Sequence, residues 1–456
     1  MKYSSTTLTN TSLVAYILII PFLTAVYFGL TLPVSFDESC TFLLFTNKGL
    51  LETITHYPAP NNHVLFSILT HLTNGIPNIS NLMRIRIPAI GIHLLTLISL
   101  YRFVATFFNR NLAVVVVCVS SLLFLNIYYS YMARGYGLIN LCFVNCLYYS
   151  FKICNAIETR KSLILFGLFS VVGMYTIPTF IYPIVTLSVF IILVKPNLFW
   201  TQVKVGLCVL TLTSMLYAPI IYYDGLDSIT GNSFVKPMPF IKTLHSIPLY
   251  YLNTIAEITG IHWSIVIILM GWSGYKILKS GTKIERYFTL IAIAAPAILL
   301  CIQRVNPYAR VFNYNSFVFV LILFLPYQNQ IKNLKLSTLL IPILIAQSLL
   351  LLHFNAAILK YEDKDCAINI TSNAIIKKIM GNKRYLLNGT LLNYNLEFDL
   401  ISKGFKNYQI DMPNRCFMNA DTISNYDFVV TEPALDKTQK KKPLYQTEYY
   451  TIYGSH

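Results

Sequence analysis

Charged side chains are scarce in this sequence. They make up 12% of its 456 residues, whereas 55% of the residues are hydrophobic. A soluble domain of this length has no core large enough to bury so much apolar surface. The shortage of charge therefore excludes an ordinary soluble protein and predicts a chain that lies largely within a membrane.

Apolar runs of about twenty residues recur along most of the chain, and each is long enough to form a membrane-spanning helix. We expect an all-α polytopic membrane domain over residues 1–355 with about eleven such helices. No small-residue cleavage site follows the first run, so we expect an uncleaved first span. The expected spans lie near residues 11–33, 84–106, 112–129, 135–153, 162–177, 179–194, 204–222, 262–279, 286–302, 313–327 and 336–354.

Several common functional motifs are also missing. The sequence has no CxxC pair with the spacing of a zinc site and no Gly-rich phosphate-binding loop. Most of its nine cysteines lie in or beside apolar runs, as buried small hydrophobic residues do. Cys366 and Cys416 lie in the polar C-terminal part. They are candidates for a disulfide if that part faces an oxidising compartment, and the sequence leaves this open.

The basic residues are distributed unevenly. The net charge is +16, but the lysines and arginines fall in short loops between apolar runs and form no clustered basic face. This positive-inside pattern is typical of a membrane protein, so we expect membrane lipids and no nucleic acid as partners. The ambiguous segment is 60–76, which is nearly long enough to span but carries several polar residues. If it does not cross, every later basic cluster falls on one side, which should be the cytoplasm.

We therefore interpret residues 34–83 as one long external loop whose helices lie at the interface or re-enter partway. The N-terminus is then cytoplasmic, and residues 356–456 lie on the opposite side. This C-terminal part alternates strand-like and helix-like runs and predicts a small extracytoplasmic α/β domain. Its expected strands lie at 385–389, 426–431 and 449–453, and its expected helices near 371–380 and 391–404.

Asp37 and Glu38 stand side by side directly after the first apolar run. Ionisable residues at the mouth of a membrane domain are rare and usually functional, so this pair is the first candidate site. The alternative is a solvated pair that closes a helix end. The predicted topology brings further polar residues to the same face: Asn62, His63, Arg84, Arg134, Tyr136, Arg304 and Arg310.

Arginine binds phosphate through bidentate, charge-assisted hydrogen bonds. A carboxylate surrounded by arginines therefore indicates glycosyl or phosphoryl transfer. Structural alternatives stay open for several residues. Arg84 and Arg86 are also suited to anchor a helix end, and Arg304 and Arg310 to bind lipid headgroups. His63 is also suited to form hydrogen bonds within its own loop.

The sequence resembles integral-membrane glycosyltransferases of the GT-C fold. Within them it is similar to the bacterial branch of RgtA/B/C/D-like enzymes, protein O-mannosyltransferases and the lipid A aminoarabinose transferase. The resemblance departs from the family pattern after His63, where prolines are missing, and at Val311, where tyrosine is usual. The stretches that carry the likeness are FDESCT (36–41), PNNHVLF (60–66), MRIRIPAIGIHLLTLISLYRF (83–103), SYMARGYGL (130–138) and NPYARVF (306–312).

The resemblance implies a glycosyltransferase of the bacterial cytoplasmic membrane. Such an enzyme moves a sugar from a polyprenyl-phosphate donor to a glycan, lipid or protein acceptor on the extracytoplasmic face. Asp37 would serve as the general base, with Glu38 orienting it or binding the sugar. Arg134 and Arg310 would stabilise the lipid-phosphate leaving group, and His63 would position the donor or the acceptor. No metal is expected, and if a divalent ion binds, Asp37 and Glu38 are its expected ligands.

Two other classes of protein fit the same composition. A polytopic transporter or lipid flippase without transferase activity would carry polar groups near the bilayer midplane in paired halves. This sequence has no internal repeat, and its polar groups lie at helix ends. A structural membrane protein, with Asp37 and Glu38 as a surface feature, is the second alternative.

The predicted topology can be tested by cysteine labelling. A cysteine introduced near residue 110 should react only with a membrane-permeant reagent, because the basic loop there is expected in the cytoplasm. A cysteine in the 225–245 loop should react with an impermeant reagent from outside. Labelling near residue 110 by the impermeant reagent would show that the predicted orientation of the chain is wrong.

Overall fold

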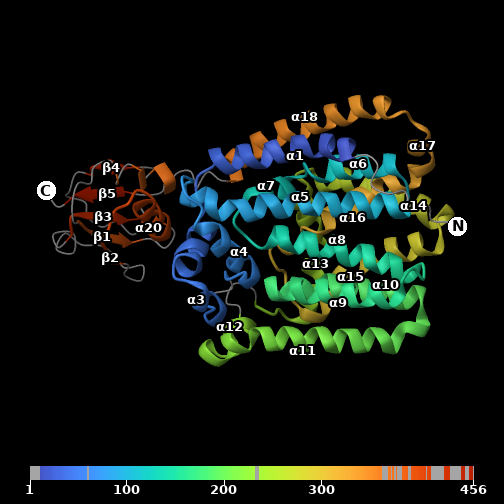
Figure 1. Cartoon of the computed structure of the whole chain (residues 1–456), viewed down its shortest axis with the longest axis horizontal. Helices are drawn as coiled ribbons and strands as arrows, with labels where there is room; N and C mark the ends of the chain where they lie inside the picture. Colours follow the sequence, from blue (N-terminus) through green and yellow to red (C-terminus); the bar gives the residue numbers. More distant parts are fainter. Residues whose placement is uncertain are drawn as a thin grey trace.

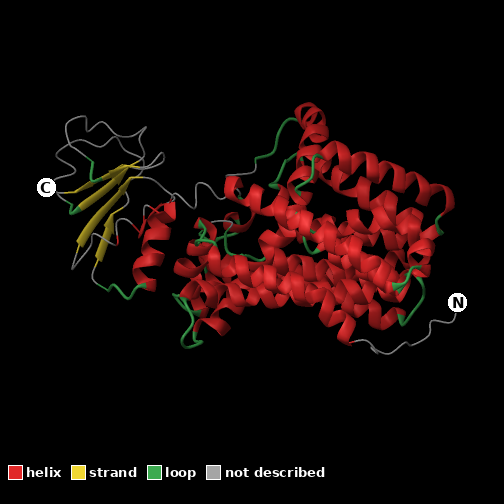
Figure 2. Cartoon of the chain, turned by 90° about the horizontal axis from the view of Figure 1, so that it is seen from above, coloured by secondary structure: helices red, strands yellow, loops and turns green. Residues whose placement is uncertain are grey.

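The computed structural model consists of a large helical bundle and a small β-sheet unit at one end of it (Figure 1). Figure 2 shows the strands gathered beyond that end of the helices. The prediction of an all-α membrane domain followed by a small α/β region is confirmed. The structure describes residues 11–58, 61–231, 236–361, 368–370, 372–373, 376, 383–388, 392–406, 408–411, 426–431, 443–446 and 451–454.

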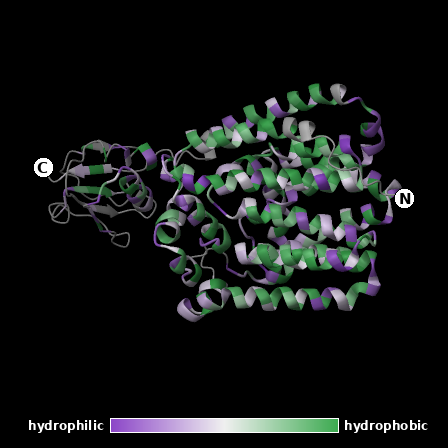
Figure 3. Ribbon diagram, viewed as in Figure 1, coloured by the Kyte–Doolittle hydropathy of each residue, from purple (hydrophilic) through white to green (hydrophobic). Residues whose placement is uncertain are grey.

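Long apolar helices build the bundle, and hydrophobic residues predominate along them (Figure 3). Among the residues that the structure describes, five helices are long and apolar enough to cross a membrane, or up to eight if each bent pair of helices is one span. The expected number of about eleven therefore stays a prediction. The longer helices are α1 (Thr11–Thr31), α5 (Asn81–Phe107), α8 (Tyr136–Cys154), α9 (Thr159–Thr176), α10 (Ile181–Val194), α11 (Phe199–Asp224), α13 (Phe240–Thr259), α14 (Trp263–Ser280), α15 (Lys283–Gln303) and α18 (Leu336–Tyr361).

The bundle differs from the expected spans at three places. The run 112–129 is not one helix but two, α6 (Arg110–Ser120) and α7 (Phe124–Tyr131), bent by 75°. The run 313–327 holds only a ten-residue helix, α16 (Asn315–Phe324), between two 3₁₀ turns at Ala309–Phe312 and Leu325–Tyr327. The expected loop 223–247 contains α12 (Asp227–Thr230) and the start of α13 (Phe240–Thr259).

Local interactions accompany two of the bends, between α6 and α7 and between α13 and α14, and hydropathy alone does not reveal them. The side-chain amide of Asn126 donates a 2.7 Å hydrogen bond to the carbonyl of Ser120, the last residue of α6, which also accepts a 3.3 Å bond from the backbone N–H of Leu123. Gly260 ends α13 in a left-handed conformation with φ 72°, which is strained for any residue with a side chain. The next helix, α14, is bent by 94° from α13. A short polar contact or a single glycine thus redirects an otherwise uniform apolar run.

The segment 34–83, expected from the sequence to be an external loop, folds into four short helices. α1 is followed by α2 (Phe36–Thr41), which continues into a π-helical turn (Phe42–Thr46). The segment formed by α2 and this turn is bent by 82° from α1. α3 (Leu50–Thr55) and α4 (Val64–Asn74) complete the loop. α4 has eleven residues, fewer than the roughly twenty that a span needs, which supports the interpretation of 60–76 as a segment that does not cross.

The sheet unit, which we define as β1–β5 with helix α20 (Leu392–Ser402), has the strand order β2-β1-β3-β5-β4. β1 pairs parallel with β2 and β3, and β5 pairs antiparallel with β3 and β4. The three expected strands and the helix at 391–404 are confirmed. The strands are β1 (Lys383–Asn388), β2 (Tyr408–Asp411), β3 (Phe428–Thr431), β4 (Tyr445–Gln446) and β5 (Thr451–Gly454).

Part of the structure expected for the C-terminal region falls on residues that the structure does not describe. Most of the expected helix 371–380, together with Cys366 and Cys416, lies outside the described residues. α18 continues to Tyr361, so the expected domain boundary after residue 355 falls inside this helix.

Candidate active site

Helix α2 carries both acidic residues of the first candidate pair, and its own sequence explains why it forms. The hydroxyl of Ser35 accepts a hydrogen bond from the backbone N–H of Glu38, while the Ser35 N–H donates to the Glu38 carboxylate. This is a capping box, which fixes the first turn of a helix. It also fixes the direction of the two acids, because Glu38 must turn back toward the start of α2.

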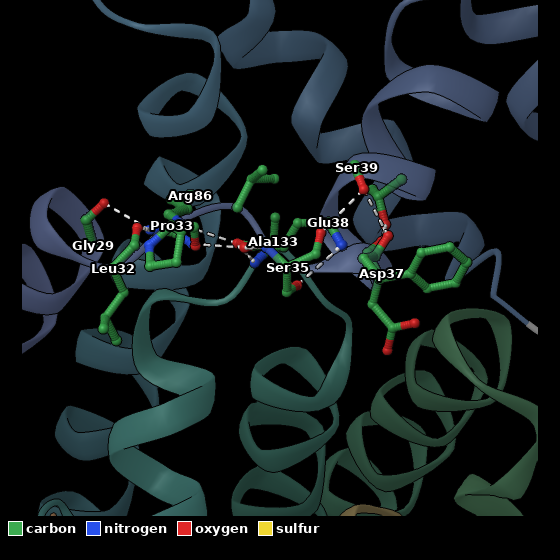
Figure 4. A network of polar contacts seen from close by, with 12 residues as sticks. Gly29, Leu32, Pro33, Ser35, Asp37, Glu38, Ser39, Arg86 and Ala133 are labelled. Carbon is green, nitrogen blue, oxygen red and sulfur yellow. Dashed lines mark hydrogen bonds and ion pairs between the residues drawn. The ribbon is translucent and has the colours of Figure 1, made fainter. Parts of the chain in front are cut away.

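Glu38 is fully buried and forms a bidentate ion pair with Arg86 of α5. Arg86 donates from Nε to one carboxylate oxygen at 2.8 Å and from Nη2 to the other at 2.6 Å. The backbone N–H of Ala133 adds a third bond to the Glu38 carboxylate at 2.9 Å. Figure 4 shows this network and the Asp37 side chain directed away from it.

Arg86 uses all of its hydrogen-bond donors in this network. Its remaining N–H groups donate to the backbone carbonyls of Gly29, Leu32 and Pro33, at the end of α1 and just beyond it. A guanidinium group has five N–H donors, and here each has an acceptor. The buried pair therefore ties together α1, α2, α5 and the turn after α7, and its high desolvation cost is offset by complete hydrogen bonding.

Asp37 lies on a different face of α2, and its side chain is 31% exposed. One carboxylate oxygen, Oδ2, lies 3.6 Å from Nη2 of Arg134 and 3.6 Å from Nη1 of Arg310. These distances allow electrostatic attraction but are too long for direct hydrogen bonds. The three charged groups therefore come together from distant parts of the sequence, around a carboxylate that is partly exposed.

Arg134 is almost completely buried in the turn between α7 and α8. Its Nη1 group donates to the backbone carbonyl of Asn61 at 2.9 Å and to the Asn61 side chain. Within the part of the chain that the structure describes, its Nε atom has no hydrogen-bond partner. A buried guanidinium group with an unused donor is suited to bind an additional anionic or oxygen-rich ligand.

His63 faces Arg134 and is buried. Its Nδ1 atom accepts a 2.8 Å hydrogen bond from the backbone N–H of Gly135, and its Nε2 atom lies 3.4 Å from Nη2 of Arg134. Burial, helped by Arg134 and Arg310, holds the pKa of His63 well below its usual 6.5, so the ring is neutral at physiological pH. Because Nδ1 accepts, the proton of the neutral ring is on Nε2. Two donors, from His63 and Arg134, thus face the same space, as at a binding site for an oxygen anion.

The tight approach of the α7–α8 turn to His63 depends on Gly135. A Cβ atom at this position would lie 2.7 Å from Cγ2 of Thr176 and 2.8 Å from Cβ of His63. Any larger residue would push the turn and the histidine apart. Glycine therefore allows Arg134, Gly135 and His63 to meet.

Aromatic rings surround Arg310. Its guanidinium carbon lies 4.6 Å from the ring centroid of Tyr308 and 5.8 Å from that of Tyr136, within range of cation–π attraction. Tyr136 also packs edge-on against His63, with ring centroids 4.9 Å apart. Glu257 of α13 lies within electrostatic range of Arg310. Arg310 is thus held beside the Asp37 carboxylate and against two tyrosines.

The structure brings together five of the residues singled out from the sequence: Asp37, His63, Arg134, Tyr136 and Arg310. The other four occupy different positions. Glu38 is buried on Arg86 and does not share the space around Asp37. Asn62 faces its own loop, where its amide donates to Thr53 and His56 and its carbonyl accepts from Ser67.

Arg84 and Arg304 lie nearer the surface. Arg84 bonds to Asn81 on its own helix. Arg304 is exposed in a left-handed conformation at the end of α15, and among the described residues its side chain forms no ion pair or hydrogen bond.

The candidate residues chosen from the sequence did not include Asn61 or Glu257, and Arg86 was considered only together with Arg84, as a helix anchor. One signal was present, because the Ser-x-x-Glu spacing of residues 35–38 is typical of a capping box and indicates that Glu38 folds back onto its helix. No local signal distinguishes Arg86 from Arg84, two residues away. Glu257 was missed because helix α13 was not expected.

The described residues include no group of three or more His, Cys, Asp or Glu side chains arranged to hold a metal ion. Both oxygens of Glu38 are already engaged by Arg86. The adjacent acids are therefore not arranged as a joint pair of metal ligands, because only Asp37 faces the open space.

No protein-family model matches the sequence, and no curated protein is similar to it in sequence. The fold is similar to the crystal structure of ArnT from Cupriavidus metallidurans bound to undecaprenyl phosphate. The TM-score is 0.66 at 10% identity, over 97% of this chain and 98% of that one. The apo structure of the same protein gives a TM-score of 0.64 at 10% identity, with the same coverage.

A second similar structure is the Archaeoglobus fulgidus oligosaccharyltransferase in complex with Zn and sulfate. It has a TM-score of 0.52 at 12% identity, over 91% of this chain and 68% of that one. At these identities the likeness concerns the fold. The chain has the GT-C fold expected from its motifs.

The different settings of Arg86 and Arg84 lead to a stability prediction. Replacing Arg86 by alanine leaves the Glu38 carboxylate buried without its partner, which should cost roughly 3–5 kcal/mol and sharply reduce the yield of folded protein. Arg84→Ala is the matched control on the same helix and should change stability by less than about 1 kcal/mol. Thermal unfolding of the purified variants in detergent measures both. Equal unfolding temperatures for the two variants would contradict the assigned role of the buried pair.

Proposed function

We propose that this protein is a glycosyltransferase that moves a sugar from a polyprenyl-phosphate donor to an acceptor hydroxyl. Transfer would take place on the extracytoplasmic face of the bacterial cytoplasmic membrane. The observation that carries the proposal is the meeting of Asp37 with Arg134 and Arg310 at one end of a helical bundle. A base beside an anion-binding site is the minimum that this reaction requires.

The choice of donor is supported by the structural comparison. The ArnT structure contains undecaprenyl phosphate, a polyprenyl phosphate, and its fold matches this chain over nearly its whole length. A polyprenyl chain would cost about 0.8 kcal/mol per CH₂ group to transfer into water, so its phosphate must be reached at membrane level. The arginines at the end of the long apolar helices meet that requirement.

Asp37 is the proposed general base. Its carboxylate would take the proton of the acceptor hydroxyl as the acceptor oxygen bonds to the anomeric carbon of the sugar. The bond between that carbon and the phosphate oxygen breaks at the same time, and its electron pair leaves with the lipid phosphate. One base is enough for a direct displacement with inversion, so a second catalytic carboxylate is not needed.

The leaving phosphate gains negative charge, which Arg134 and Arg310 would stabilise. Arg134 is rigidly held by Asn61, so its position is set before the donor binds. The neutral His63 would add a donor from Nε2 to the same oxygens. Arg310, packed on tyrosines and part-exposed, would contact the donor at the edge of the site.

The assignment for Glu38 changes from the one expected from sequence. We propose that it holds α2 in place through Arg86 and takes no part in sugar binding, because its oxygens are already bonded. The residues beside Asp37 do not form a metal-binding set, so the proposal includes no metal-dependent step. The sugar and the acceptor would be identified by comparing glycans from cells with and without the gene.

The role of Asp37 can be tested by substitution. Asp37→Asn should lower the rate of sugar transfer by about 100-fold or more, because positioned general bases contribute about 10²–10⁴-fold. The assay measures transfer by purified protein of the sugar that the glycan comparison identifies. Asp227→Asn removes an exposed carboxylate in the loop after α11 and should leave the rate unchanged. Activity within threefold of wild type for Asp37→Asn would make the base assignment wrong.

Arg134 can be tested with undecaprenyl phosphate alone. Arg134→Ala should weaken binding of this lipid between about 10-fold and 100-fold, because a charge-assisted hydrogen bond contributes roughly 1.5–3 kcal/mol. Arg304→Ala, which removes an exposed arginine, should bind like wild type. Native mass spectrometry of the purified variants measures both. Unchanged binding for Arg134→Ala, with normal turnover at saturating donor, would assign it a structural role. Movement of the lipid across vesicles without sugar transfer would favour a transporter.

A further inference from the structure

Helix α20 of the sheet unit packs directly on α2, the helix that carries Asp37. The contact joins residues more than 350 positions apart in the sequence. Two aromatic pairs flank it. Tyr394 meets Phe36 edge-on with ring centroids 5.5 Å apart, and Phe398 meets Phe42 at 5.0 Å.

Asn395 lies at the centre of this contact and is fully buried. Its side-chain oxygen lies 2.5 Å from the hydroxyl of Ser39, which donates to it. Its side-chain N–H donates to the backbone carbonyl of Val34 at 3.2 Å. The side chain of Asn395 thus bonds both to Ser39 on α2 and to Val34, the residue just before the N-cap of α2.

α2 has only six residues, and a helix of this length is not stable by itself. Its position must come from its neighbours. Glu38 ties it to the bundle through Arg86, while Phe36 and Ser39, three residues apart on one face, meet α20. Asp37 lies between these two attachments and points toward the arginines. Loss of either attachment would let the carboxylate shift.

We propose that Asn395 is a positioning residue, which holds α2 so that the Asp37 carboxylate faces Arg134 and Arg310. The sheet unit then completes the active site without touching the substrate. This inference rests on the proposed function, because it assigns Asn395 a part in the proton transfer by Asp37. A carboxylate displaced by about 1 Å loses much of its effect as a general base, although the donor still binds.

Asn395→Ala should therefore lower kcat between about 10-fold and 100-fold. The binding of undecaprenyl phosphate should stay within twofold of wild type. Ser39→Ala removes the same hydrogen bond from the other side and should lower kcat in the same direction. The control is Ser402→Ala, which removes a bond from Asn81 to α20 but leaves α2 untouched, and it should have wild-type activity.

A double variant separates positioning from general destabilisation. If Asn395 acts only through Asp37, then Asn395→Ala combined with Asp37→Asn should be no slower than Asp37→Asn alone. If Asn395 merely stabilises the fold, the two losses should multiply. Multiplied losses, or a wild-type kcat for Asn395→Ala, would overturn the inference.

Cys40 gives a readout that does not depend on activity. Its thiol is buried on α2, so N-ethylmaleimide should label it slowly in wild type and several-fold faster in Asn395→Ala, as followed by mass spectrometry of the Cys40 peptide. An unchanged labelling rate would also overturn the inference. If wild-type protein transfers no sugar, the proposed function fails, while labelling of Cys40 still shows whether Asn395 holds α2.

Discussion

The buried ion pair of Glu38 and Arg86 is the interaction on which the rest of the site depends. Burying two charges is costly, and the cost is recovered only when every donor and acceptor is satisfied. Here the five N–H groups of Arg86 and both oxygens of Glu38 have partners. The partners come from the end of α1, the start of α2 and the turn after α7. The requirement for complete bonding therefore fixes three chain segments relative to α5.

The two neighbouring acids serve opposite purposes because their surroundings differ. The capping box turns Glu38 toward the bundle, where it is neutralised by a single guanidinium group. Asp37, one residue earlier, points to a partly exposed space between two arginines that do not bond to it directly. A carboxylate that is already fully hydrogen-bonded gives rigidity, whereas one with open coordination is available for chemistry. The buried, fully bonded acid thus supports the proposed general base.

The short helix α2 connects the two parts of the molecule. On one side it is held by the bundle, and on the other by Asn395 and Phe398 of the sheet unit. The polar residues around Asp37 likewise come from the segment between α1 and α5, the α7–α8 turn and the turn after α15. A site assembled from separate segments stays accurate only if each segment is anchored, and short anchored turns such as the one at Gly135 provide this.

Much of this architecture was predictable from the sequence. Hydropathy determined that the chain is a helical membrane protein, because apolar runs of sufficient length leave few alternatives. The basic loops and the position of polar residues at helix ends predicted that Asp37 and Arg134 lie on one face, and the structure brings them together. The alternating pattern after residue 356 predicted the strands and α20. These properties depend on local composition, which each segment carries by itself.

Only the tertiary structure decided which acid is buried, which of Arg84 and Arg86 pairs with it, and that Asn395 reaches α2. The bends after Ser120 and at Gly260 were equally hidden, because a few local contacts produce them within uniform apolar runs. The role of an ionisable side chain depends on its desolvation and on partners from remote segments. Neither the desolvation of a side chain nor its remote partners can be inferred from the residues next to it in the sequence.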